Sequence, residues 1–188
     1  MFKYLKHLKV IMSPIHQSRK EAIIEYILDN PNARIRVNDI ARKLGVSKGS
    51  VSLTLKKLVE EGFVTDLHVN MDNPEVRTFK ILINIRSIMN KGVISRLKRY
   101  ALGAGLYGSW AKGTNTEDSD IDLWIIPKKS FRQADIAEIS GKIREILGVD
   151  TQILVLSKER IERLKRDNTV FYHSLLFSSM QLYGEEVE

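Results

Sequence analysis

The residues best suited to chemistry lie in the stretch LYGSWAKGTNTEDSDIDLWII, where an aspartate pair follows a Gly-Ser turn. Ten residues separate Ser109 from Asp120, and Asp122 then leads into an apolar run. Because side chains alternate along a strand, Asp120 and Asp122 are predicted to share one face. Two like charges this close are costly unless a cation neutralises them, and hard carboxylate oxygens favour Mg²⁺ or Mn²⁺. The pair therefore predicts a divalent metal site.

The Gly-Ser turn carries groups that can hold a triphosphate. Gly108 lets the backbone approach phosphates closely, and Ser109 offers its hydroxyl and backbone N–H groups to phosphate oxygens. Lys112 adds a positive charge, and Gly113 permits a sharp exit from the turn. Taken alone, the Gly-Ser turn would be an ordinary turn and the aspartate pair would belong to an ordinary polar loop. Together and in this order, the two halves indicate a nucleoside triphosphate bound with a metal.

These residues resemble the motif of minimal nucleotidyltransferases of the DNA polymerase beta superfamily, and the likeness extends over about residues 88 to 184. Trp110 and Lys112 depart from the commonest pattern, and a lysine supplies charge without the bidentate fork of an arginine. The matching positions are Gly108, Ser109, Ala111, Gly113, Ser119, Asp120, Asp122 and Leu123.

The resemblance implies a reaction and a third carboxylate. The reaction is metal-assisted transfer of AMP from ATP to a hydroxyl group, with release of pyrophosphate. Asp150 takes the place of the third catalytic carboxylate, which binds the metal near the acceptor and helps to deprotonate the attacking hydroxyl. Alternatively, Asp150 only satisfies the amides of the turn after Gly148. Small family members modify partner toxins or antibiotics, so a protein, an RNA and a small molecule all stay open as acceptor.

The second half of the chain is predicted to place these residues on a small mixed sheet. The evidence is the alternation of short apolar runs with amphipathic helical periods. We expect strands over 104–107, 121–126 and 151–156, and helices over 87–100, 131–147, 157–166 and 170–183.

The first half is predicted to form three helices and a hairpin. The first helix covers residues 19–28, the second starts at about Asn38 and ends at Gly45, and Ser47 caps the third. Two β-prone runs, 63–69 and 76–85, flank an Asn/Asp/Pro-rich tip and are interpreted as a hairpin. The segment LGVSKGSVSLTLKKLVEEGFV resembles winged helix-turn-helix regulators of bacteria and archaea, over roughly residues 18 to 85.

The third helix of this half has a face suited to duplex DNA. Its apolar residues share one side, and small, hydroxyl and cationic groups lie opposite. These groups are Gly49, Ser50, Leu53, Lys56 and Lys57, to which Lys48 and Arg42 add backbone contacts. Residues 1–86 hold 15 Lys/Arg against 9 Asp/Glu, a net +6, whereas residues 87–188 hold 15 against 14, a net +1. The excess favours a polyanion partner. A protein-binding module, or a site that recruits a protein or RNA substrate, is the alternative.

Composition narrows the class of protein further. Hydrophobic residues make up 43% and charged residues 28% of the chain, and the net charge is +7. The absence of cysteine excludes disulfides and thiolate metal sites. No apolar run approaches the roughly 20 residues of a spanning helix. The basic N-terminal segment, residues 1–16, lacks a cleavage site for secretion. We expect a cytoplasmic protein without a membrane partner, and a homodimer stays open.

These patterns together predict an α+β protein with two domains, a winged helix-turn-helix domain over 1–86 and a nucleotidyltransferase domain over 87–188. The expected function is metal-dependent nucleotidyl transfer coupled to DNA binding. The alternative is a DNA-binding regulator whose second domain senses nucleotide without turnover.

Overall fold

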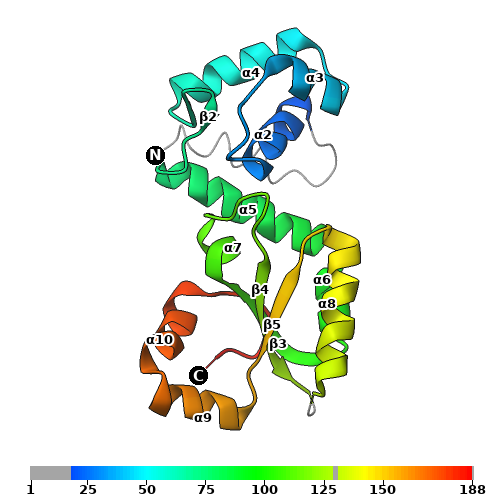
Figure 1. The fold of residues 1–188 in the computed structure, drawn as a ribbon, viewed down its shortest axis with the longest axis vertical. Helices are drawn as coiled ribbons and strands as arrows, with labels where there is room; N and C mark the ends of the chain where they lie inside the picture. Colours follow the sequence, from blue (N-terminus) through cyan, green and yellow to red (C-terminus); the bar gives the residue numbers. More distant parts are fainter. Residues whose placement is uncertain (1–17, 129–130, 188) are drawn as a thin grey trace. The chain divides into compact units, whose positions relative to one another are not determined.

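The computed structural model describes residues 18–128 and 131–187, which divide into two compact units between Arg77 and Thr78 (Figure 1). The basic segment at residues 1–16 lies outside the described residues. Among the described helices, none is long and apolar enough to cross a membrane.

In the described part of the first unit, three helices are followed by a two-stranded hairpin, as expected for a winged helix-turn-helix. Ser18 and Glu21 form a capping box at the start of the first helix, and Ser47 accepts a hydrogen bond from the backbone N–H of Ser50 at the start of the third. Gly45 ends the second helix in the left-handed conformation. The elements are α2 (Arg19–Asp29), α3 (Val37–Leu44), α4 (Lys48–Glu60), β1 (Val64–Thr65) and β2 (His68–Val69).

The predicted wing is wrong in its second strand. The hairpin closes within residues 64–69, with Asp66 and Leu67 at positive φ in the turn. Residues 76–85 belong instead to the helix α5 (Pro74–Asn90). Pro74 occupies the first helical position, where a missing N–H costs nothing, and the Asn73 side chain accepts from the N–H of Glu75. The β-branched residues of this run favour strands, but its buried positions recur at helical spacing.

A four-stranded mixed sheet forms the centre of the second unit. Its strands are β3 (Ala101–Tyr107), β4 (Ile121–Pro127), β5 (Thr151–Val155) and β6 (Met180–Gly184), in the order β5-β4-β3-β6. β3 is antiparallel to both β4 and β6, whereas β4 and β5 are parallel. The small mixed sheet was correctly predicted from the sequence.

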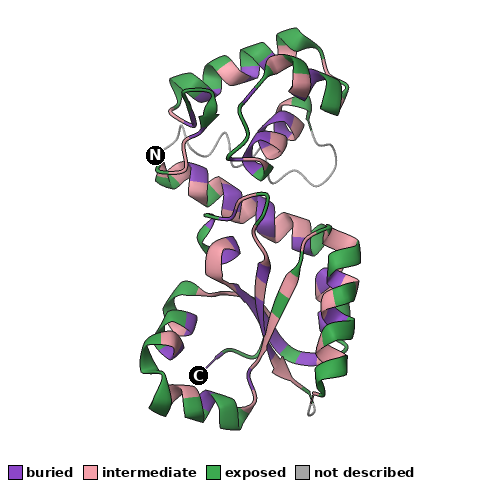
Figure 2. Ribbon diagram, in the orientation of Figure 1, coloured by how far each residue is buried: buried purple, intermediate pink, exposed green. Residues whose placement is uncertain are grey.

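Helices cover both faces of this sheet (Figure 1). α6 (Val93–Leu97) and α8 (Gln133–Leu147) lie on one face, and α9 (Lys158–Asp167) and α10 (Thr169–Ser178) lie on the other. Alternate residues of β4 separate the two cores. Ile121, Leu123 and Ile125 pack with α6 and α8, whereas Trp124 packs with α9 and α10. The buried positions run through the sheet in Figure 2.

Two predicted helices of this unit have different bounds. The helix expected over 87–100 is divided, because α5 continues to Asn90 and Gly92, at positive φ, separates it from α6. The helix expected over 170–183 ends at Ser178, and its last residues form β6, which pairs with β3. The segment Met180–Tyr183 is too short to show a clear period, so the strand is specified by its partner β3 and not by local pattern.

Candidate active site

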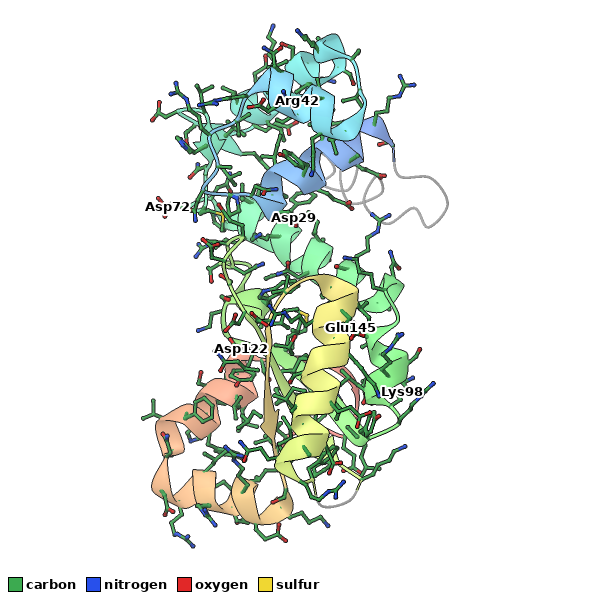
Figure 3. The ribbon with its side chains drawn as sticks, turned by 45° about the vertical axis from the view of Figure 1, so that its right-hand side comes forward. Asp29, Arg42, Asp72, Lys98, Asp122 and Glu145 are labelled. Carbon is green, nitrogen blue, oxygen red and sulfur yellow. The ribbon has the colours of Figure 1, made fainter. Side chains whose placement is uncertain are left out.

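The two motif aspartates lie at the start of β4, where the strand emerges from the loop after the Gly-Ser turn. Asp120 immediately precedes the strand and Asp122 is its second residue. Asp122 has the same parity as Trp124, so both side chains lie on the face that α9 and α10 cover (Figure 3 labels Asp122). Both carboxylates are partly exposed. Asp122 therefore follows the strand alternation, whereas Asp120 lies just before the strand, and the shared face of the pair stays a prediction.

Gly108 brings the Gly-Ser turn directly onto the Asp122 carboxylate. Tyr107 pairs with Asp122 across the antiparallel β3–β4 ladder, so the turn begins beside this aspartate. Gly108 has φ of +66°, and a Cβ there would lie 2.1 Å from Oδ2 of Asp122. Any other residue would displace the carboxylate and strain the backbone. Glycine is required here for close approach as well as for its conformation.

The remaining residues of the predicted phosphate turn form the short helix α7 (Gly108–Lys112) and its exit. Gly113 is at positive φ and its N–H donates to the carbonyl of Ser109. Lys112 is exposed at the end of α7, and Ser109 is partly exposed near the start of this helix. Ser119 Oγ accepts from the backbone N–H of Thr116 at 2.8 Å, which orders the loop that leads to Asp120.

A buried pair of asparagines is hydrogen-bonded to the backbone of this turn. Asn84 of α5 and Asn115 are 2% and 4% exposed. Nδ2 of Asn84 donates to the carbonyl of Trp110 at 2.9 Å and to Oδ1 of Asn115 at 2.9 Å. The sequence analysis missed both residues. A polar side chain at a helical core position of α5 was the signal, and it was hidden because that run was interpreted as a strand.

The electrostatics of the site reflect two carboxylates close together. Burial, followed by the negative charge of Asp120, raises the pKa of the Asp122 carboxyl above its ordinary value. Burial, followed by the charge of Asp122, also raises the pKa of the Tyr107 phenol, and the nearby Arg160 of α9 opposes this rise. Both shifts disfavour negative charge, so the site gains stability from a bound cation.

Asp150 does not join the pair in this structure. Its carboxylate forms an ion pair with Arg144 of α8 at 2.9 Å. Its backbone carbonyl accepts a hydrogen bond from the N–H of Ile121. Within the residues that the structure describes, no three histidine or acidic side chains gather to hold a metal. Gln152, two residues further along, pairs with Asp122 across the parallel ladder, and its Nε2 donates to Oδ2 of Asp120 at 3.0 Å. Sequence reasoning missed Gln152, although it shares the strand parity of Asp150.

The residues predicted to contact DNA lie in the first unit, on α4 except for Arg42, which lies on α3 and pairs with Asp39 at 2.9 Å. Lys48, Lys56 and Lys57 are exposed, and Lys56 makes a long ion pair with Glu60, at 4.0 Å. Ser50 is partly exposed, and its backbone is engaged in the cap by Ser47 and in a bond from Thr54 Oγ1. Its hydroxyl is therefore placed at the start of the helix, beside the lysines.

Two family models match the chain. Residues 86–176 match the nucleotidyltransferase domain, and residues 18–65 match the winged helix-turn-helix DNA-binding family. A curated relative, the HTH-type transcriptional regulator Ptr1 of Methanocaldococcus jannaschii, is 38% identical over 53 residues. That match covers 28% of this chain, and the chain spans only 35% of the relative's length.

The comparison with solved structures found chains from toxin-antitoxin complexes. A toxin-antitoxin with AMP-PNP is 23% identical, with a TM-score of 0.40, over 51% of this chain and 74% of that chain. A tri-AMPylated Shewanella oneidensis HEPN toxin in complex with MNT antitoxin gives 19% identity and a TM-score of 0.37, over 53% of this chain and 73% of that chain.

The fold and the motif define a protein of mixed α/β class that joins a helix-turn-helix to a nucleotidyltransferase fold. More specifically, the winged helix-turn-helix match lies over residues 18–65 and the nucleotidyltransferase match over residues 86–176.

Proposed function

We propose that the protein is a metal-dependent nucleotidyltransferase that transfers AMP from ATP to a hydroxyl group and binds duplex DNA through its winged helix. The observation that carries the first half is the contact between Gly108 and the Asp122 carboxylate. A backbone turn suited to phosphates and a carboxylate suited to a metal lie against each other, with 2.1 Å between a Cβ built at Gly108 and Oδ2 of Asp122. A triphosphate held by the turn would have its metal at the aspartate pair.

The residues present fit Mg²⁺ or Mn²⁺. Asp120 and Asp122 supply hard oxygen ligands, and burial together with the negative charge of Asp120 raises the pKa of Asp122, so a bound cation is favoured there. A third protein carboxylate is not needed, because Mg²⁺ commonly binds one or two carboxylates together with substrate phosphates and water. When bound, the metal would neutralise charge on the triphosphate and polarise the phosphorus under attack.

Each residue of the candidate active site has a distinct role in this proposal. Ser109 donates hydrogen bonds to the phosphates, Lys112 neutralises their charge, and Gly113 lets the chain turn away. Asp120 and Asp122 hold the metal, and catalysis rests mainly on positioning and electrostatics. Asp150 remains our proposal for the acceptor side, where it requires release from Arg144, now 2.9 Å away.

DNA binding is proposed for the winged helix, with Lys48, Ser50, Lys56 and Lys57 as contacts. The family match over residues 18–65 and the exposed lysines of α4 support it. In the division that we propose, residues 1–86 bind DNA and residues 87–188 carry the transferase. The acceptor is a protein, an RNA or a small molecule.

A second candidate is a regulator that binds nucleotide without turnover and changes only its affinity for DNA. The match to a segment of a transcriptional regulator favours it. The two are separated by incubating the protein with ATP labelled at the α-phosphate, Mg²⁺ and a cell extract. Transfer predicts a labelled acceptor and released pyrophosphate, whereas saturable ATP binding without either product would establish the sensor.

A further inference from the structure

The outer face of α4 carries two residues that the fold of the first unit does not explain. Leu53 is 67% exposed and lies opposite the side that packs into the core through Val51, Thr54 and Leu58. Gly49, one turn earlier, lies on the same face. Figure 2 shows exposed residues along the length of α4. An exposed leucine beside a glycine inside a helix is an arrangement that calls for a partner.

The glycine has no structural reason to be there. Its φ is not positive, and a Cβ built on it would meet nothing within 4 Å. Alanine would be a better helix former at this position. In contrast, Gly108 is required by its contact with a carboxylate. The space that Gly49 leaves beside Leu53 therefore fits the close approach of another molecule.

The charges around these two residues identify that molecule as a polyanion. Lys56 and Lys57 are exposed and lie within about 60° of Leu53 around the helix axis, and Lys48 is exposed at the start of α4. An apolar group between cations fits the major groove, where phosphates flank base edges and the C5-methyl group of thymine is the apolar feature. We propose that Leu53 reads thymine methyl groups in the major groove, with Gly49 admitting the base edge beside it. This rests on the DNA binding proposed above and adds the base that is recognised.

Val59 provides a matched control on the same helix. It is also an exposed apolar residue, at 55%. Six residues from Leu53, it lies about 120° away from Leu53 around the helix axis. Loss of its side chain should leave DNA recognition unchanged.

The experiment first selects duplexes from a randomised DNA library with the full-length protein. In the selected duplex, each thymidine is then replaced by deoxyuridine, whose base lacks only the C5-methyl group of thymine. By fluorescence anisotropy, we expect the wild type to lose about three- to fivefold in affinity for each contacted thymine, the factor for one buried methyl group. Leu53→Ala should bind both duplexes equally, and Val59→Ala should discriminate as the wild type does. Gly49→Ala should melt no lower than the wild type but bind the selected duplex at least about tenfold more weakly, because the added methyl group blocks close approach.

The outcomes separate this inference from the function on which it rests. If the wild type binds duplex DNA but does not distinguish thymine from deoxyuridine, or if Leu53→Ala still distinguishes them, the thymine contact is wrong and DNA binding stands. If no duplex is retained at low salt, or a randomised RNA pool is preferred, both fail.

Discussion

The buried asparagine pair behind the phosphate turn gives a quantitative test of how the site is held. Asn84→Ala removes the two hydrogen bonds of 2.9 Å that Asn84 donates, to the carbonyl of Trp110 and to Oδ1 of Asn115, and the one of 3.4 Å that it accepts from Nδ2 of Asn115. It leaves both acceptors in a site where Asn84 and Asn115 are 2% and 4% exposed, so water does not replace the lost donor easily. A buried polar group left without a partner costs about 1–3 kcal/mol. We expect Asn84→Ala to lower the free energy of unfolding by about 2–4 kcal/mol.

The assay is urea unfolding followed by tryptophan fluorescence. Both tryptophans of the chain, Trp110 and Trp124, belong to the second unit, so the signal reports the unit that contains the pair. Combining Asn84→Ala with Asn115→Ala should cost less than the sum of the single changes, by at least about 1 kcal/mol, because the two side chains bond to each other. Asn90→Ala, at an exposed position of α5, is the control. A loss below about 0.5 kcal/mol for Asn84→Ala, the range of ordinary surface changes, would refute the reasoning.

Three further predictions concern the aspartate pair, the turn and α4. The pKa of Asp122 is raised by burial and by Asp120, so the folded protein holds this proton more tightly than the unfolded chain does. In chelator, the melting temperature should therefore fall as pH rises from below 3.8 through the raised pKa, and less so in Asp122→Asn. Gly108→Ala should cost at least about 1–2 kcal/mol of stability from its positive φ and should also abolish transfer, as measured by denaturation and label incorporation. Lys56→Ala combined with Lys57→Ala should reduce the slope of log affinity against log salt by about 1–2 in DNA titrations.

Each of these predictions has a control in the same chain. Gly148 also has positive φ, but nothing lies within 4 Å of its Cβ position, so Gly148→Ala should cost stability without loss of transfer. Lys142→Ala with Lys158→Ala removes the same charge from the second unit and should leave the salt slope unchanged. An unchanged pH profile in Asp122→Asn, activity retained in Gly108→Ala, or an unchanged slope after loss of Lys56 and Lys57 would each contradict the corresponding interpretation.

Local pattern predicted those parts of the fold in which several signals agree. Gly45 predicted the end of α3. Ser47, together with the helical spacing of the apolar residues that follow it, predicted α4. The Gly-Ser turn and the aspartates predicted a strand-turn-strand that the structure contains, because glycine at positive φ and strand alternation are local properties. Family matches confirmed the two kinds of domain.

Pattern failed where non-local contacts decide the outcome. Residues 76–85 have strand-like composition, yet they form α5, since Pro74 and Asn73 start a helix whose buried face packs into the fold. Residues 180–184 became β6 only because β3 offers a free edge. The same limit applies to the site. No spacing rule indicates that Gln152 contacts Asp120, or that Asn84 reaches the carbonyl of Trp110 from 26 residues away.

The most direct test of the central claim is the rate of label transfer from ATP labelled at the α-phosphate, with Mg²⁺ and an extract that contains the acceptor. The chain offers a matched set of variants, in which Asp120→Asn and Asp122→Asn change the metal ligands and Asp118→Asn changes an exposed loop residue. Because a metal in such a site supplies several kcal/mol and about 1.4 kcal/mol is tenfold in rate, each ligand change should slow transfer by at least about a hundredfold. Asp118→Asn should transfer label at the wild-type rate. Near-normal transfer in Asp122→Asn, or equal losses in Asp118→Asn and Asp120→Asn, would contradict a metal site built on the aspartate pair.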